Sequence, residues 1–219
     1  MCVRFFLESG VEELMRNYKV KTVDEKVSGY SAGNFYPAQN AIVVLEDKSR
    51  VIMFAKWGFN YDSKKKIIVN ARAETILDRP LFKDAARYAR CIVPANWFYE
   101  WKAEGAGKKV RYRIGLQDAS IMSLGGLYKL SFDKDLGPQL AFVIITTDAE
   151  EGVREVHPRM PLIIKEEWVD MWLSKDTPVE LVEEILRAKT GAKFTVEKCE
   201  DAASNKIKEG MYGEQMSMF

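Results

Sequence analysis

The chain has 219 residues, of which 47% are hydrophobic and 30% charged, a composition that suits one globular domain and argues against disorder. A net charge of +1 argues against a uniformly basic surface but leaves room for a local basic groove. Cys2, Cys91 and Cys199 are far apart and there is one histidine, so we expect no disulfide scaffold, no metal and no cofactor. No apolar run could cross a bilayer and no signal-peptide pattern begins the chain, so we expect a soluble, cytoplasmic protein that binds no membrane.

Strand-like runs make up most of the predicted elements. They are rich in β-branched and aromatic residues and lie between polar turns, as strands do. In chain order they cover 40–47, 49–57, 90–95, 96–102, 110–116, 120–128, 139–147 and 193–199. Turns carrying glycine and charge, at 104–109 and 133–138, are typical of hairpin loops and not of domain boundaries.

Helical spacing is confined to a few segments. Ser9 and Glu12 have capping-box spacing, which predicts a first helix over roughly 10–19. Apolar spacing predicts further helices over 81–89, 165–173 and 179–189. The last of these has Thr177 as its expected N-cap, Pro178 at its first helical position and Glu180 as the capping-box partner.

These elements predict an α+β fold. We expect a single domain over 1–219, with a bent, barrel-like, mostly antiparallel sheet and peripheral helices. The polar tail from about 203 is expected to be loosely ordered.

The first five residues, MCVRF, place a cysteine directly behind the initiator methionine. Removal of Met1 would give Cys2 a free α-amine beside its thiol, a reagent that no internal residue can offer. The alternative is that Cys2 is a small buried hydrophobe opening the first strand.

Glu100 and His157 are the titratable residues in the most unusual settings. Glu100 lies in the aromatic run NWFYEWK, where strand alternation places Phe98 and Glu100 on one face and Trp97, Tyr99 and Trp101 on the other. Desolvation among aromatic rings would raise the pKa of Glu100 and suit it to proton transfer, whereas an edge-strand Glu100 would simply face water. His157 precedes a proline in HPRMP, and it is either a structural hydrogen-bonding residue or an acid–base group.

Other polar stretches also have two interpretations. Asn70, in VNARAET, is either an ordinary turn or cap residue before a helix-like segment or part of a site. Basic residues gather at 64–66 and again at Lys102, Lys108, Lys109, Arg111 and Arg113. Each cluster is either a solvated turn or strand face or part of a basic groove.

Together, four motifs in order resemble the SRAP (SOS response-associated peptidase) family of abasic-site DNA–protein crosslinking proteins. They are MC-x-RF, NARAET, W-F-x-E-W and H-x-RMP, and the likeness extends along essentially the whole chain. Asn34 and Pro37 match the family's N-x-x-P segment, and Trp57-Gly58 matches a Trp-Gly pair. The resemblance implies one mixed α/β domain with a barrel-like antiparallel sheet.

The resemblance also implies a chemistry. The α-amine of Cys2 would condense with the ring-opened aldehyde of an abasic site in single-stranded DNA, and its thiol would close a thiazolidine. An α-amine has a pKa of about 8, against about 10.4 for lysine, so near neutral pH it is the free base far more often. The expected partner is single-stranded DNA, bound by a monomer that associates with the nucleoid.

Residue roles follow from the same resemblance. Asn70 would lie beside the terminus and hydrogen-bond the opened sugar or the amine, while Glu100 and His157 would handle protons. Five residues match positions that border or hold DNA: Arg4, Asn34, Pro37, Arg72 and Arg159.

The sequence departs from the family pattern at two places, and it leaves two other functions open. Val3 replaces the usual glycine after the cysteine, and WGFNYDSKKK lacks the usual P-G-W, so Phe59 or Tyr61 is expected to stack on DNA and the lysines at 64–66 to bind its backbone. The chain could instead be a thiol autoprotease or peptidase with Cys2 as nucleophile. It could also be a non-covalent single-stranded DNA-binding module.

Overall fold

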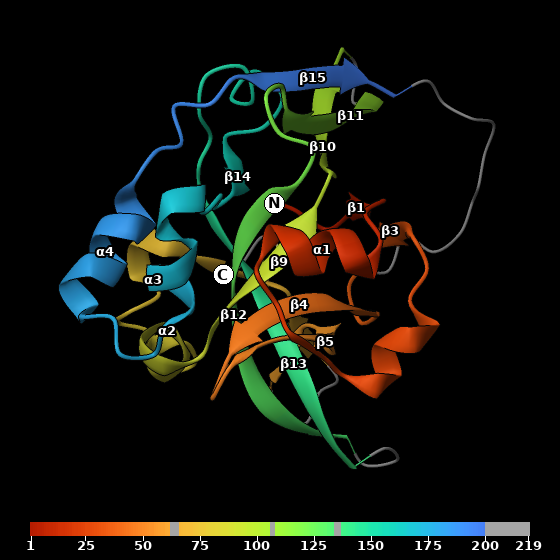
Figure 1. The fold of residues 1–219 in the computed structure, drawn as a ribbon. Coiled ribbons are helices and arrows are strands. Elements are labelled where there is room, and N and C mark those ends of the chain that lie inside the picture. The colour runs from red at the N-terminus through yellow and green to blue at the C-terminus, as the bar shows by residue number, and fades with distance from the viewer. Residues whose placement is uncertain (62–65, 106–107, 134–136, 200–219) are drawn as a thin grey trace.

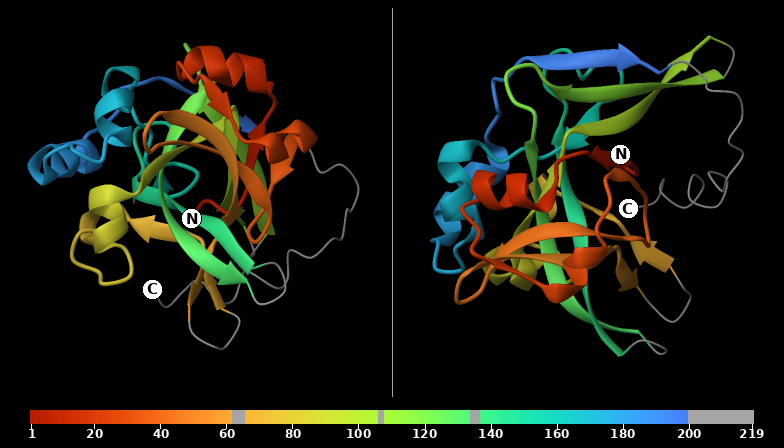
Figure 2. Two further views of the ribbon diagram at one scale, coloured as in Figure 1. Left: turned by 60° about the horizontal axis from the view of Figure 1, so that its bottom comes forward. Right: turned by 45° about the vertical axis from the view of Figure 1, so that its right-hand side comes forward.

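A closed barrel of five strands forms the centre of the protein, in a computed structural model that describes residues 1–61, 66–105, 108–133 and 137–199. The strands follow the order β13, β12, β9, β4, β5, with antiparallel neighbours throughout. A parallel pair between β5 and β13 closes the ring, which Figure 2 shows nearly end-on in its left view. The barrel strands are β4 (Asn40–Glu46), β5 (Arg50–Trp57), β9 (Arg90–Ala95), β12 (Met122–Asp133) and β13 (Gly137–Asp148).

The barrel strands are buried on both faces. In β4, Ala41 and Val43 belong to one hydrophobic cluster, and Ile42 and Val44 belong to the other. A strand with two covered faces reads as a continuous apolar run, which explains the sequence NAIVVLE.

Helices pack around the outside of the barrel, with α2, α3 and α4 together at the left of Figure 1 and α1 apart from them. Leu14, Ala86, Trp172 and Ile185, one from each helix, are buried in the same cluster as Ile42 of the barrel. The helices are α1 (Val11–Asn17), α2 (Lys83–Tyr88), α3 (Val169–Leu173) and α4 (Val179–Arg187), and three-residue or five-residue 3-10 helices lie at η1 (Glu25–Gly29), η2 (Ala73–Thr75) and η3 (Glu166–Trp168).

A second antiparallel sheet of five strands lies beside the barrel and extends from the top of Figure 1 to its right-hand side. Its inner face packs on the barrel, because Phe5, Phe98 and Ile114 are buried in one cluster with Trp57 and Phe142. In order, the strands are β15 (Phe194–Lys198), β11 (Lys108–Leu116), β10 (Trp97–Glu104), β1 (Phe5–Leu7) and β3 (Gly33–Phe35).

Short strands complete the topology. The parallel pairing of β8 with β13 sets Asn70 opposite Ile144, which positions the polar residues of NARAET. The short strands are β2 (Thr22–Val23), β6 (Phe59–Tyr61), β7 (Lys66–Ile68), β8 (Asn70–Arg72) and β14 (Arg159–Pro161). Of the helices in the described ranges, none is long and apolar enough to cross a membrane.

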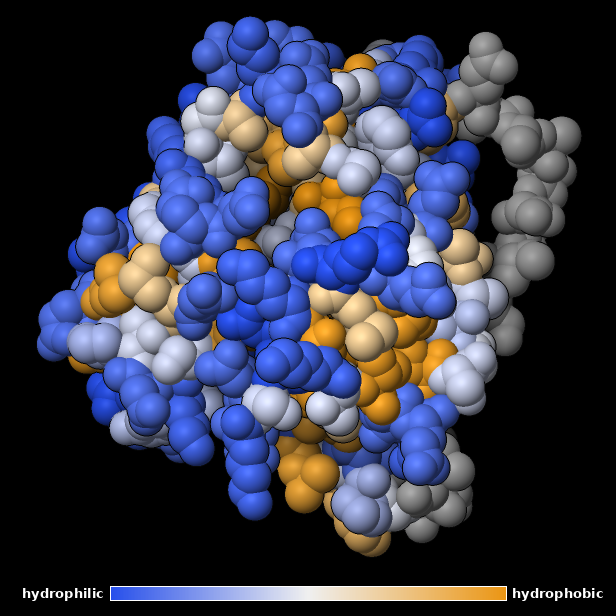
Figure 3. Space-filling model, viewed as in Figure 1, coloured by the Kyte–Doolittle hydropathy of each residue, from blue (hydrophilic) through white to orange (hydrophobic). Residues whose placement is uncertain are grey.

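The hairpin of β12 and β13 carries two exposed apolar side chains near its tip. Leu130 and Phe132 are 73% and 71% exposed, and Figure 3 shows hydrophobic atoms at this lower end of the molecule. On the opposite face of the hairpin, Lys129 covers the buried ring of Phe59, with its Nζ 4.4 Å from the ring centroid. The expectation that Phe59 stacks on DNA is therefore wrong, because its ring is fully buried.

The α+β prediction is confirmed, with its strand runs and both hairpins. The strands form two larger sheets, however, and the helix-like segment after Asn70 is only the short 3-10 helix η2.

Both capping predictions are wrong. Gly10 caps α1 without a side-chain hydrogen bond while Ser9 faces Asn96 (Oγ to Nδ2, 3.5 Å). Pro178 occupies the N-cap of α4, and the Thr177 hydroxyl donates to the Met171 carbonyl.

Close packing inside the barrel predicts that Gly126→Ala is destabilising. A Cβ at Gly126 would lie 2.9 Å from Cys91 Sγ and 3.0 Å from the Val143 carbonyl oxygen, which is backbone and cannot turn away. Overpacking of this kind lowers the free energy of unfolding by about 1–3 kcal/mol. Urea denaturation should show this loss for Gly126→Ala and little change for Gly29→Ala, where nothing lies within 4 Å. Equal midpoints for the two variants would contradict the packing argument.

Candidate functional site

The N-terminal segment is anchored inside the protein. Cys2 is fully buried, and its thiol donates to the Arg4 carbonyl at 3.6 Å. Asn70 Nδ2 donates to the Cys2 carbonyl oxygen at 2.9 Å. Next to Asn70, the Val69 carbonyl accepts a hydrogen bond from the buried indole of Trp57 at 2.9 Å, so the barrel fixes the position of β8.

The α-amine of Met1 lies between the two titratable residues that the sequence singled out. It is 3.3 Å and 3.4 Å from the two carboxylate oxygens of Glu100 and 3.1 Å from His157 Nε2. Cys2, Asn70, Glu100 and His157 therefore converge on the beginning of the chain, although they come from four separate segments.

Glu100 is a nearly buried carboxylate, with 2% of its side chain exposed. Burial raises its pKa to about 7, and the positive charge of the Met1 amine only partly opposes that shift. Among the described residues, neither Glu100 Oε1 nor Asn70 Oδ1 has a hydrogen-bond partner. Two buried acceptors beside one amine are a polar site that suits a ligand able to donate hydrogen bonds.

His157 is held by the backbone of Arg159. Its Nδ1 lies 2.9 Å from the Arg159 carbonyl oxygen and accepts from the Arg159 N–H at 3.0 Å. Either tautomer is accommodated, so Nε2 can accept from an ammonium group or donate to a free amine. Burial lowers the pKa of His157, which keeps the imidazole neutral near pH 7.

The Cys2 thiol is protonated over the physiological pH range. Burial raises its pKa to about 12, and the nearby charge of Glu100 acts in the same direction. The site therefore presents a neutral thiol next to groups that can accept its proton.

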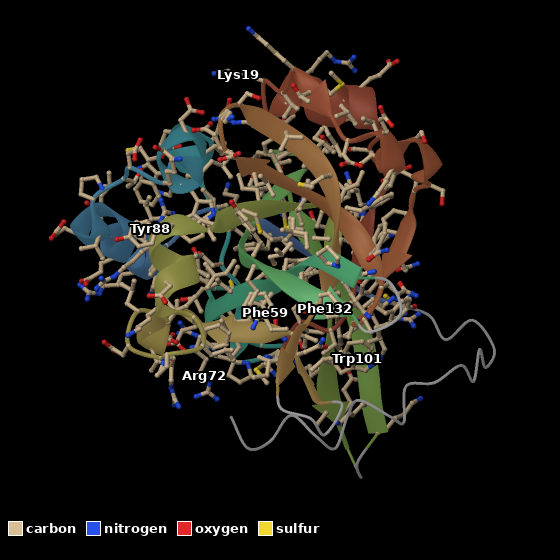
Figure 4. All side chains as sticks on the ribbon, turned by 90° about the horizontal axis from the view of Figure 1, so that it is seen from below. Lys19, Phe59, Arg72, Tyr88, Trp101 and Phe132 are labelled. Atoms are coloured by element: carbon tan, nitrogen blue, oxygen red, sulfur yellow. The ribbon has the colours of Figure 1, made fainter. Side chains whose placement is uncertain are left out.

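Of the two arginines expected near phosphates here, only Arg72 is unengaged. Arg72 is exposed without a partner among the described residues, and Figure 4 shows it at the periphery of the molecule. Arg159 donates to Glu74 Oε1 at 2.6 Å, to Asp148 Oδ1 at 2.7 Å and to the Thr146 carbonyl at 2.7 Å. Sequence reasoning missed these partners, because no spacing signal connects Glu74 or Asp148 with Arg159.

The remaining predicted DNA contacts lie at the edge of the second sheet. Arg4 Nε donates to Asn34 Oδ1 at 3.0 Å, which brings those two residues together. Asn34 is exposed, whereas Pro37 is buried and can act only by shaping its loop. The lysines at 64–65 lie outside the described residues. The side chains of Tyr61 and Lys66 are also not described.

A family model described as SOS response associated peptidase (SRAP) matches residues 1–206, so the chain belongs to the SRAP family.

Similar proteins agree with this assignment. The chain is 31% identical over 193 residues to the abasic site processing protein YoaM of Bacillus subtilis, covering 85% of each chain. It is 30% identical over 194 residues to the abasic site processing protein YoqW of Bacillus phage SPbeta, covering 85% of this chain and 87% of that one. A crystal structure of a protein from Bacteroides thetaiotaomicron is similar with a TM-score of 0.80 and 25% identity, over 91% of this chain and 93% of that chain.

The raised pKa of Glu100 predicts a pH dependence of stability. The folded protein holds a proton at Glu100 up to about pH 7, whereas the unfolded chain releases it near the ordinary value of 4.5. The stability that this group contributes is complete below pH 4.5, and it is lost as the pH rises toward about 7. Urea titrations of protein that retains Met1 should therefore show Glu100→Gln gaining stability relative to wild type across that window and holding the gain above it.

Glu155→Gln is the control, because Glu155 is exposed. Its stability should run parallel to that of the wild type through the same window. A parallel curve for Glu100→Gln would mean that Glu100 is not desolvated in the folded protein.

Proposed function

We propose that this protein recognises abasic sites in single-stranded DNA and becomes covalently joined to them through Cys2 after Met1 is removed, shielding the lesion. The observation that carries the proposal is the convergence of a buried carboxylate, an imidazole and a cysteine on the first α-amine of the chain. The names of the similar proteins YoaM and YoqW, abasic site processing proteins, support the same substrate.

The proposed reaction joins one amine, one thiol and one aldehyde with loss of one water. The Cys2 nitrogen attacks the aldehyde carbon of the ring-opened sugar, and the resulting carbinolamine loses water to give an imine. The thiol sulfur then adds to the imine carbon, while its proton passes to the nitrogen. The product is a five-membered thiazolidine, and no oxidant or reductant is required.

Glu100 is suited to the proton transfers of this reaction. With a pKa of about 7, its carboxyl group can accept a proton from the attacking amine and return one to the departing hydroxyl near neutral pH. Its Oε1 and the Oδ1 of Asn70 accept no hydrogen bond from the described residues, so both can accept from sugar hydroxyl groups.

His157 complements Glu100, because it is neutral where Glu100 is half ionised. The backbone of Arg159 tolerates either imidazole tautomer, so Nε2 can take a proton or give one without moving the ring. Two groups whose pKa values are shifted in opposite directions can divide the acid and base roles between them.

Met1 prevents the reaction while it is present. Its peptide bond turns the Cys2 nitrogen into an amide, and its own amine occupies the place facing Glu100 and His157. Removal would expose the Cys2 amine next to the same two groups, with the Asn70 hydrogen bond to the Cys2 carbonyl unchanged.

Contacts with the DNA backbone would flank this centre. Arg72 is exposed two residues beyond Asn70 and is free to bind a phosphate. Arg4 and Asn34 would hold the strand at the sheet edge. A phosphate that binds Arg159 must compete with Glu74 and Asp148, so Arg72 is the stronger candidate.

A thiol peptidase acting on other chains is less well supported. Such an enzyme needs a thiolate, and burial raises the pKa of Cys2 to about 12. Ring closure onto an imine is intramolecular and proceeds from a neutral thiol with a nearby base.

Mass spectrometry tests the proposal directly. Protein incubated with a single-stranded oligonucleotide that carries one abasic site should gain the mass of the strand less one water, and only the fraction without Met1 should react. Cys2→Ala should lose the heat-stable adduct, because an alanine amine forms only a reversible imine. It should still bind undamaged strands. A heat-stable adduct of Cys2→Ala, or one on protein that retains Met1, would eliminate the thiazolidine.

Glu100→Gln tests the proton-transfer role separately. The amide keeps the size of the side chain but cannot ionise, so crosslinking should slow by about a hundred- to ten-thousandfold. Affinity for undamaged strands should change little. Rates are measured from adduct formation over time, with Glu155→Gln as the exposed-carboxylate control. A wild-type rate for Glu100→Gln would remove Glu100 from the mechanism.

A further inference from the structure

The second sheet has an outer face from which the proposed function uses Arg4 alone, apart from Asn34 at the sheet edge. Strand alternation turns Phe98 and Glu100 inward, toward the barrel, and turns Trp97, Tyr99 and Trp101 outward. The register of β10 with β11 sets Tyr99 opposite Arg113 and Trp101 opposite Arg111. The basic cluster that the sequence left with two interpretations therefore lies on the same face as an aromatic row.

Arginine and aromatic side chains stack on one another along this face. The Arg4 guanidinium lies 4.5 Å from the Tyr99 ring centroid, and Arg111 lies 5.9 Å from the same ring. Arg113 lies 4.7 Å from the Trp97 ring. We call this set the outer platform: Arg4, Trp97, Tyr99, Trp101, Arg111 and Arg113.

Gly115 makes room for one ring of the platform. A Cβ at Gly115 would lie 2.7 Å from Cε3 of Trp97, so the indole covers the backbone of β11 at that point. The ring therefore lies against the sheet with the Arg113 guanidinium over it, and it stays partly exposed.

Folding accounts for Tyr99, which is only 9% exposed, but not for the two tryptophans. Neither Trp97 nor Trp101 belongs to the two described core clusters, and both stay partly exposed. Large rings held at a surface among arginines are typical of binding sites.

The charge of this face differs from that of the whole chain. Arg4, Lys109, Arg111 and Arg113 supply four positive charges. Among the described positions of β10, β11 and β15 that share this face, the one carboxylate is Glu197, which lies opposite Arg113. The net charge of the full chain is only +1. A local positive face on a near-neutral protein attracts a polyanion to one place.

We propose that the outer platform binds undamaged nucleotides of the same single strand, beyond the abasic site. Phosphates would pair with the arginines and bases would stack on the rings, a combination that binds single strands without reading sequence. This inference rests on the proposed function for its ligand.

Arg4 connects the two sites. Its carbonyl accepts the Cys2 thiol inside the protein, while its side chain lies over Tyr99 on the outside and hydrogen-bonds Asn34 at the sheet edge. A strand that leaves Cys2 past Asn34 thus reaches the platform. Figure 4 shows Trp101 well apart from Arg72, so the platform extends the contact in a direction different from that of Arg72.

The test compares strands of two lengths, since only a long strand can cover both sites. Wild type should bind an undamaged strand of about 20 nucleotides at least tenfold more tightly than one of about five nucleotides. Trp101→Ala should weaken binding of the long strand by roughly tenfold, as loss of one stacked base does. Arg113→Gln should weaken it as well and lower the salt slope by about one.

Lys165→Gln is the matched control. Lys165 also stacks on a ring, 5.2 Å from Trp168, but it lies beside α3 and outside the second sheet. Its removal should leave binding of the long strand unchanged. Arg113→Gln remains decisive should Trp101→Ala fail to fold, because Arg113 is 45% exposed and the change removes only its surface ion pair with Glu197 and its contact with the Trp97 ring.

Crosslinking of a short abasic strand separates this inference from the proposed function. Both platform variants should crosslink it at the wild-type rate. If both variants bind the long strand as tightly as the wild type and still crosslink the short one, the outer platform does not bind nucleotides, and the proposed function is unaffected. Wild-type affinity for polyglutamate equal to that for the long strand would also overturn the inference, because the face would then bind any polyanion. Failure of wild type to crosslink would overturn the proposed function, while the length comparison would still decide the platform.

Discussion

The parallel pair between β5 and β13 closes the barrel, and the geometry of the site follows from it. Trp57 ends β5 at this pair, and its indole holds the Val69 carbonyl. The next residue, Asn70, begins β8, which pairs with β13. From there the Asn70 side chain donates to the Cys2 carbonyl oxygen. Gly58, with φ of +126°, makes the turn out of the pair in a region that other residues rarely adopt. An open sheet would leave Asn70 without a fixed place.

Electrostatics at the site depend on burial more than on formal charge. Glu100 would be an ordinary carboxylate in water, but on the inner face of β10 its pKa rises to about 7. His157 is shifted the opposite way by the same cause. The core that stabilises the protein therefore also sets the protonation states, and changes in packing near Phe98 would alter the chemistry without touching a titratable group.

Much of the fold was predictable, because both faces of its strands are covered and the apolar runs are strong. The alternation of Phe98 and Glu100 against Trp97, Tyr99 and Trp101 was also predictable, since it needs only the period of a strand. Helix caps were not, because Ser9 and Thr177 found other partners in the folded protein. Nor did spacing indicate that Arg159 is held by Glu74 and Asp148, or that Phe59 is covered by Lys129, since such contacts join distant segments.

The anchoring of the first residues has a consequence for how this segment can vary. Cys2 is buried, whereas Arg4 lies over Tyr99 at the surface. Residues two apart share one face of a regular strand, so the chain ahead of β1 departs from strand geometry to bury the cysteine. Inserting or deleting a single codon between Cys2 and β1 would shift the cysteine along the chain and break its contacts with the Arg4 carbonyl and with Asn70. Replacing Val3 leaves the length of the segment unchanged. The gene should therefore accept many missense changes at the third codon and reject every change in the length of this segment.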